Sequence, residues 1–260
     1  MAHYNVSFAG AGRVAGALCM EMHCSGITIR QIVSETAKNG KSLAGKCKAS
    51  WSSDLVFYEP VDIIIVAVPD HRLTEVLKNI RCPGTARVAH TAGSFGIDMF
   101  PETIGHKGVF YPLQTFSRER KISFRDLPFF IEASDMKTSG ILKGLAEKLG
   151  GKVYTVDAEH RKMLHLAAVY ACNFTNHMLT AGKEIALKAG FSFEVLEPLI
   201  RETISKALEK GPDNSQTGPA VRNDQNTIGK HLDLLSFSPE LQKVYRVVTE
   251  SIIHHYKKIR

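Results

Sequence analysis

The chain has 260 residues, of which 44% are hydrophobic, so it is long enough to bury a full core without disulfides or a structural metal. Its formal net charge is +7, but the 33 basic residues are scattered. We therefore expect a solvated surface that mildly attracts anionic ligands, and no nucleic-acid binding. The five cysteines form no C-x-x-C pair, which argues against a disulfide framework and against a cysteine-rich zinc site.

The sequence gives no sign of a membrane segment or a metal site. The first residues lack the basic segment and apolar run of a signal peptide, and the longest apolar stretch, Ile63 to Pro69, is far shorter than a membrane span. His254 and His255 are adjacent, but no carboxylate accompanies them at a spacing suited to a metal. We expect a cytoplasmic protein with reduced thiols, no membrane contact and no metal.

The first half of the chain alternates short β-branched runs with helical patterns. Strands are predicted at 4–9, 27–33, 63–68, 87–91, 107–111, 129–132 and 152–156, and helices at 11–22, 36–47, 72–79 and 137–149. This alternation predicts an α/β fold with a parallel, doubly wound sheet of the Rossmann type. The run DIIIVAVP is apolar on both faces, as is typical of a central parallel strand.

From about Asp157 the strand-like runs vanish and long helical periodicities follow, at 159–189, 193–210, 225–235 and 239–257. The segment 211–219 is dense in turn formers and is predicted to be a loop. We therefore predict a dinucleotide-binding domain at 1–156 and a mostly helical substrate and dimerisation domain at 157–260. The helices carry more apolar positions than one small layer can bury, which predicts a homodimer.

The glycines that follow the first predicted strand give the main functional signal. Gly10 permits a tight turn, Gly12 lets the backbone approach a pyrophosphate, and Ala15 or Gly16 allows close packing of helix and strand. The start of the next helix offers free amides and a partial positive charge. The alternative is a glycine-rich turn that binds no ligand. The cofactor residues predicted from this segment are Gly10, Ala11, Gly12, Arg13 and Val14.

Two further strand ends are expected to border the cofactor. Ala67, Val68 and Pro69 close the central strand, and Thr91 closes the next one, at the sheet edge where ligands of open α/β sheets bind. A simpler interpretation is that Pro69 ends a strand and Asp70 caps the following helix.

Several segments resemble known reductases. FAGAGRVAGAL, DIIIVAVPD and HTAGS resemble the Rossmann domains of pyrroline-5-carboxylate reductases, β-hydroxyacid dehydrogenases and deazaflavin-dependent NADP reductases. YPLQTFS, HLAAVYACNF and TGPAVRNDQNTIGKHL are similar to a little-characterised group assigned as NADP oxidoreductases with a helical C-terminal domain. The resemblance covers nearly the whole chain and implies a reductase or dehydrogenase whose helical domain dimerises. Two positions depart from the group's pattern: Tyr111 stands where histidine is expected, and Glu35 where arginine is common.

The choice between NADP and NAD is expected to lie just after the second strand. Glu35 could accept hydrogen bonds from the ribose hydroxyls of NAD, whereas Ser34 and Thr36 can donate to the 2′-phosphate of NADP. Positive charge for that phosphate could come from Arg13, Lys38 or Lys41. Together with the resemblance, these cations favour NADP, and NAD is the alternative.

Hydride transfer to a C=O or C=N bond needs a group that exchanges a proton with the substrate. Lys162, His165 and Asn176 fall within one stripe of a predicted helix, with Asn173 at its edge. We predict His165 as the acid/base group, with Lys162 beside it, and Asn173 or Asn176 as an anchor for the substrate or the carboxamide. The alternatives are a structural histidine held by a backbone carbonyl and ordinary hydrogen bonds between helices.

A second candidate segment is TGPAVRND, where Thr217, Gly218 and Arg222 could bind a substrate carboxylate, because the planar fork of arginine suits that group. A turn, a salt bridge and a helix cap explain the same residues equally well.

The favoured function is therefore hydride transfer between a nicotinamide cofactor and a small, anionic substrate in the interdomain cleft. The alternative is a non-catalytic dinucleotide-binding sensor or scaffold, since the fold alone does not decide between them.

Overall fold

The computed structural model describes residues 3–117 and 120–259, and its contacts divide the chain into two compact units. The first extends to Asn173 and the second begins at Phe174. The boundary therefore falls within the helix predicted at 159–189, so that the first part of this helix, which the sequence analysis assigned to the second domain, belongs to the first unit.

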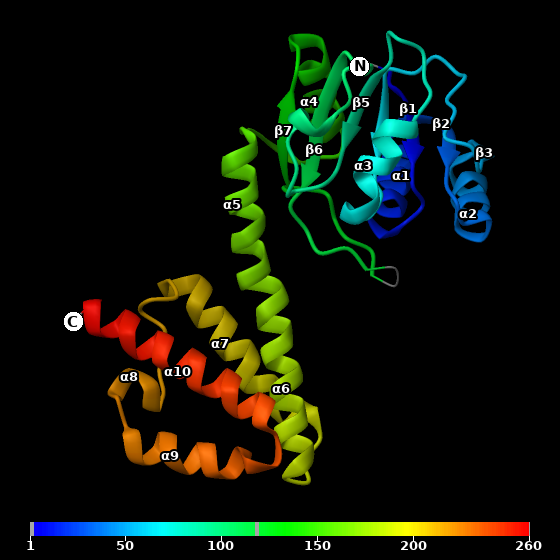
Figure 1. Cartoon of the computed structure of the whole chain (residues 1–260). Coiled ribbons are helices and arrows are strands. Elements are labelled where there is room, and N and C mark those ends of the chain that lie inside the picture. Colours follow the sequence, from blue (N-terminus) through cyan, green and yellow to red (C-terminus); the bar gives the residue numbers. More distant parts are fainter. Residues whose placement is uncertain (1–2, 118–119, 260) are drawn as a thin grey trace. The chain divides into compact units, whose positions relative to one another are not determined.

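One sheet organises the first unit (Figure 1). Its strands have the spatial order β3-β2-β1-β4-β5-β6-β7-β8. Their bounds are β1 Asn5–Ala9, β2 Thr28–Val33, β3 Ser50–Ser52, β4 Ile63–Val66, β5 Arg87–His90, β6 His106–Pro112, β7 Pro128–Ala133 and β8 Lys152–Thr155. Every predicted strand is present, and β3 is an additional strand that is too short to leave a periodic signal.

The prediction of an all-parallel sheet was wrong in one place, because β7 runs antiparallel to β6. The chain returns from β6 to β7 through 113–127, whose described residues form no crossover helix, so it re-enters the sheet in the opposite direction. A helix links β7 to β8, and that pair is parallel. The Rossmann-type α/β fold is confirmed.

Helices cover both faces of this sheet, as the alternating pattern predicted. They are α1 (Arg13–Cys24), α2 (Ala37–Cys47), α3 (Asp70–Asn79) and α4 (Met136–Lys148). Along β4, Ile63 and Ile65 belong to the core cluster formed with α1, α2 and α4, whereas Ile64 and Val66 belong to the cluster formed with α3. This alternation is the two-residue period of a strand buried on both faces, and it places β4 at the centre of the domain.

The first long helix predicted at 159–189 is present but irregular. It consists of α5 (Ala158–Ala168), the π-helical segment η2 (Val169–Phe174) and α6 (Thr175–Lys188). Asp157 caps α5 by accepting a hydrogen bond from the backbone N–H of His160. A π segment changes which side chains share a helix face, so the residue stripe inferred from an ideal helix does not hold across it.

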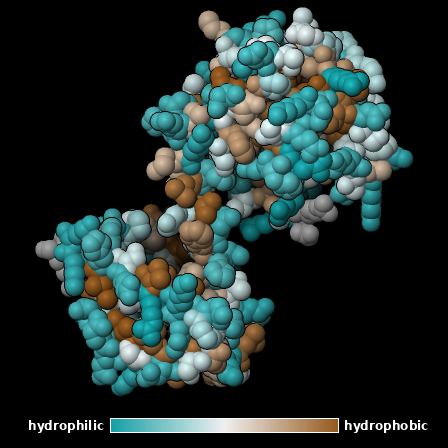
Figure 2. All heavy atoms as spheres, in the orientation of Figure 1, coloured by the Kyte–Doolittle hydropathy of each residue, from teal (hydrophilic) through white to brown (hydrophobic). Residues whose placement is uncertain are grey.

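Among its described residues, the second unit has helices and the loops between them but no strand. After α6 it contains η3 (Phe193–Leu196), α7 (Glu197–Lys210), α8 (Pro219–Arg222), α9 (Gln225–Leu234), η4 (Leu235–Phe237) and α10 (Pro239–Ile259). Within this unit, the described residues that are buried are Ala220, Ile228, Leu235 and Thr249. Large apolar side chains remain exposed, and Figure 2 shows hydrophobic atoms among the polar ones on its visible face. None of the described helices is long and apolar enough to cross a membrane.

Candidate functional site

The glycine-rich loop joins β1 to α1, and its glycines have different structural roles. Gly10 has a φ of +114°, and a Cβ there would collide with the carbonyl oxygen of Ala67. The fold therefore requires glycine at this position. Gly12 is the N-cap of α1, without a side-chain cap, and a Cβ at Gly12 would meet nothing within 4 Å. Of the two residues expected to allow close packing of helix and strand, Ala15 is fully buried in the core, whereas a Cβ at Gly16 would meet no atom within 4 Å.

Two adjoining cavities, of about 900 and 630 Å³, lie at the carboxyl ends of the parallel strands. They share four lining residues, Gly12, Ala67, Val68 and Pro69. The first cavity also includes Gly10, Ala11, Ser34, Glu35 and Thr36, and the second includes Arg13, Val14 and Thr91. The residues predicted from the glycine-rich loop, from positions 34–36 and from the ends of β4 and β5 therefore all line one of the two cavities. The open space in front of Gly12 leaves room for a bound pyrophosphate at the N-terminus of α1.

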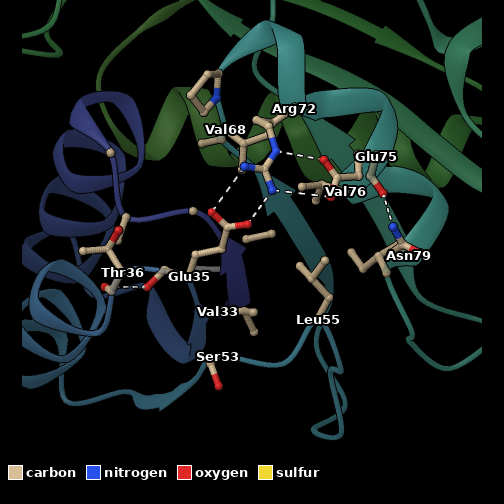
Figure 3. Close-up of a pocket in the computed structure, with 18 of the residues that line it drawn as sticks. Val33, Glu35, Thr36, Ser53, Leu55, Val68, Arg72, Glu75, Val76 and Asn79 are labelled. Carbon is tan, nitrogen blue, oxygen red and sulfur yellow. Dashed lines mark hydrogen bonds and ion pairs between the residues drawn. The ribbon is translucent and has the colours of Figure 1, made fainter.

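An ion-pair cluster that sequence reasoning missed crosses the first cavity (Figure 3). Arg72, in the first turn of α3, pairs through both terminal nitrogens with the Glu35 carboxylate that follows β2. Its Nε donates to Glu75 Oε2 at 2.9 Å. The hydrogen bonds from Arg72 to Glu35 and Glu75 raise the pKa of the guanidinium above its usual value. The sequence signal for Arg72 was its place three residues after Pro69, but the partner lies 37 residues earlier in the chain.

Ser34 is already engaged by its neighbours. Its hydroxyl donates to the carbonyl oxygen of Thr36 at 3.3 Å and accepts from Trp51 Nε1 at 3.1 Å. The Lys41 ammonium lies 4.9 Å from the centroid of the Trp51 ring. Of the cations suggested for a 2′-phosphate, Arg13 lines the second cavity, whereas Lys38 and Lys41 line neither.

His165 lies against the loop that follows β5. Its Nδ1 is 3.0 Å from the hydroxyl of Tyr111, near the end of β6, and the two rings meet edge to face. A Cβ on Gly93 would come within 2.8 Å of Tyr111 Cζ and 2.9 Å of His165 Nδ1, so only glycine fits between loop and pair. Burial raises the pKa of Tyr111 to about 12. The hydroxyl therefore stays protonated and can donate to Nδ1, and a neutral imidazole then carries its proton on Nε2.

A buried arginine one helical turn before His165 fixes α5 to the sheet. Arg161 is fully buried, and its Nη1 donates to Glu132 Oε2 on β7 at 2.6 Å. Its Nη2 donates to the backbone oxygen of Phe95, in the loop after β5. Charge-assisted bonds in a buried setting are strong and directional, so Arg161 places the face of α5 that carries His165.

His90 holds the same loop from the sheet side. It is fully buried at the end of β5, and burial lowers its pKa to about 4. The neutral ring accepts from the backbone N–H of Ala92 at Nδ1, at 3.2 Å, and Nε2 lies 3.3 Å from the carbonyl oxygen of Gly96. Nε2 therefore carries the proton, and the loop that includes Thr91 and Gly93 is tied at both ends.

The other predicted site residues belong to α5, η2, α6 and α8 or directly precede α8. Lys162, Asn173 and Asn176 are exposed, and the backbone oxygen of Asn176 accepts from the Thr180 hydroxyl. Thr217 and Arg222 are also exposed, and Gly218, with a φ of +106°, is the N-cap of α8. The catalytic role of Lys162 and Asn173 and the substrate roles of Asn176, Thr217, Gly218 and Arg222 stay predictions.

Comparison with known proteins places these features in a wider group. The family described as "domain of unknown function" (DUF2520) matches residues 127–252. A protein of Bacteroides fragilis described as a "putative NADP oxidoreductase" is 39% identical, with 97% of this chain and 98% of that chain covered and a TM-score of 0.88.

Two more distant structures share the fold. A Thermotoga maritima protein is 20% identical, with 98% of this chain and 99% of that chain covered and a TM-score of 0.73. A pyrroline-5-carboxylate reductase of Coxiella burnetii is 15% identical, with 99% and 98% covered and a TM-score of 0.59. A search of curated proteins gives no match.

Proposed function

Because the chain belongs to the family of the Bacteroides fragilis oxidoreductase, we propose that it is an NADP-dependent oxidoreductase that acts on a small, anionic substrate. The observation that carries this proposal is the convergence of four separate segments, all predicted to bind a dinucleotide, on two adjoining cavities at the carboxyl edge of the sheet. Gly12 supports it, because its missing side chain leaves free space where a pyrophosphate would approach α1.

The residues present have distinct roles in this proposal. The loop from Gly10 to Val14 binds the pyrophosphate, and Thr91 and Pro69 border the nicotinamide-side ribose. The bound cofactor supplies or accepts hydride. His165 exchanges a proton with the substrate, and the Tyr111 hydroxyl orients the imidazole so that Nε2 is the donor. Arg161 and Gly93 act indirectly, by holding α5 and the loop so that this pair can form.

Cofactor binding and turnover should be measured separately. NADPH binding can be followed through the quenching of Trp51, the single tryptophan of the chain, which hydrogen-bonds to a residue of the first cavity. A panel of ketones, imines and hydroxy acids then tests for a change in NADPH absorbance. We expect binding and turnover with at least one class. Binding without turnover across the whole panel would favour a sensor, and absence of binding would refute the proposal.

We also propose that a second copy of this chain covers the helical unit. Its exposed apolar residues include Phe191, Leu199, Leu208 and Leu234, with exposed fractions of 59 to 83%. So few buried residues in a fully helical unit indicate that its apolar surface needs a further partner. Light scattering at micromolar concentration should give the mass of a dimer, and a monomer would contradict this part of the proposal.

A further inference from the structure

Arg72 and Glu35 form the one ion pair of the described residues that spans the first cavity from α3 to the end of β2. Figure 3 shows the two side chains pointing toward one another across it. This place is where the ribose next to the adenine lies in a dinucleotide fold, so the pair bears directly on how NADP and NAD are distinguished. The inference below rests on the proposed function and concerns the same site.

The guanidinium of Arg72 is held in a fixed orientation. Nε donates to Glu75 Oε2 at 2.9 Å, within the same helix, and Nη2 also donates to Glu75 Oε1 at 3.4 Å. Both terminal nitrogens donate to Glu35. The Glu35 carboxylate therefore occupies the fork through which arginine binds planar anions with two parallel hydrogen bonds. A phosphate group fits the same fork.

The two partners differ in how easily they can move. The side chain of Glu35 is 74% exposed, so it can turn into water, whereas that of Arg72 is 35% exposed and is also tied to Glu75. When a competing anion arrives, Glu35 is the group that leaves. Arg72 then remains bonded to Glu75, with Nη1 free and Nη2 shared between Glu75 and the incoming anion.

The other polar groups near this end of the cavity are less suited to bind a phosphate. The Ser34 hydroxyl already bonds to Thr36 and Trp51, and Lys41 lies over the Trp51 ring. Lys38 does not line the cavity. Lys78, His71 and Arg81 do, but among the described residues it is Arg72 that forms an ion pair with Glu35, the second residue after β2.

We propose that Arg72 binds the 2′-phosphate of NADP, and that Glu35 is a built-in competing anion which the phosphate must displace. The preference for NADP then comes from an arginine on α3, although Glu35, the second residue after β2, is acidic. Glu35 lowers the affinity for NADP without abolishing it, because it occupies the fork only while the site is empty.

The test compares 2′,5′-ADP with 5′-AMP by calorimetry, since these ligands differ by the 2′-phosphate alone and do not involve the nicotinamide. Arg72→Met should weaken 2′,5′-ADP and NADPH binding by about tenfold or more and leave 5′-AMP binding unchanged. Glu35→Gln should tighten 2′,5′-ADP binding several-fold, because the fork is then free. Lys38→Met removes a positive charge that does not line the cavity, and it should leave the ratio of the two affinities close to that of the wild type.

Three results would overturn this inference. A wild-type preference for 2′,5′-ADP that persists unchanged in Arg72→Met would show that another group binds the phosphate. Tighter binding of NADH than NADPH, lost in Glu35→Gln, would show that Glu35 binds the ribose hydroxyls and that Arg72 only orients it. In the first case the proposed function stands. In the second case an oxidoreductase function stands, but the proposed dependence on NADP does not. Failure of the wild-type chain to bind either dinucleotide would instead refute the proposed function, and this inference with it.

Discussion

Substitution of Gly12 by valine separates ligand binding from folding. The backbone at Gly12 has φ −78° and ψ −165°, an extended conformation that valine adopts readily, and an added Cβ meets no atom of the protein within 4 Å. Valine is a poorer N-cap than glycine, so we expect a loss of at most about 1 kcal/mol of unfolding free energy. The side chain would, however, fill the space in front of the N-terminus of α1.

The expected loss of affinity follows from the bonds that a pyrophosphate makes there. One backbone N–H bond to a charged group contributes about 1.5–3 kcal/mol, and 1.4 kcal/mol corresponds to a tenfold change in affinity. Gly12→Val should therefore weaken NADPH binding by about ten- to a hundredfold for each such bond lost. Quenching of Trp51 fluorescence measures the affinity, and thermal unfolding followed by circular dichroism measures the stability.

Two matched glycine variants make this test specific. Gly10→Ala should cost about 2 kcal/mol or more of stability, because φ is +114° and the methyl group collides with the Ala67 carbonyl oxygen. Gly16→Ala lies within α1 with free space around it and should be neutral or stabilising by up to about 1 kcal/mol, with unchanged NADPH binding. If Gly12→Val binds NADPH as tightly as Gly16→Ala does, the phosphate-loop assignment is wrong.

Two further predictions concern His165 and His90. His165→Ala should lower turnover by about a hundredfold with little change in NADPH affinity. Tyr111→Phe should lower turnover less, because it removes only the hydrogen bond that orients the imidazole. A loss of turnover below about threefold in His165→Ala would show that His165 has a structural role. The pKa of His90 is lowered from its ordinary value to about 4, so the unfolded chain binds more protons than the folded chain between pH 6.5 and 4. The contribution of neutral, buried His90 to the free energy of unfolding is complete above pH 6.5 and is lost as the pH falls toward 4, by about 3 kcal/mol in all. Urea unfolding at several pH values measures this loss of stability. If His90→Gln loses as much stability as the wild type between pH 6.5 and 4, the assignment to His90 is contradicted.

The positions of seven strands along the chain and the phosphate loop could be predicted because their signals are local. A strand buried on both faces is a continuous apolar run, as in β4, and Gly10 and Gly12 lie within a few residues of the strand and helix that they join. The antiparallel step from β6 to β7 could not be predicted in this way, since strand direction depends on where the intervening chain crosses. The π segment Val169–Phe174 likewise leaves no periodic signal. The stripe that grouped His165 with Asn176 assumed a regular α-helix, whereas the π segment interrupts the helix between these two residues.

The two departures from the family pattern, Tyr111 and Glu35, could be read only once their partners were placed. Each pairs with a residue distant in sequence, Tyr111 with His165 at a separation of 54 residues and Glu35 with Arg72 at 37. A tyrosine whose pKa is about 12 can orient a neighbouring imidazole without competing for its proton, and a glutamate beside a fixed arginine is a weaker repellent of phosphate than an isolated one. Neither departure therefore requires a change of chemistry. The pairing predicts that exchanging Glu35 for arginine would place two cations side by side, so that Glu35→Arg should gain less NADPH affinity than the neutral Glu35→Gln once the repulsion from Arg72 is included.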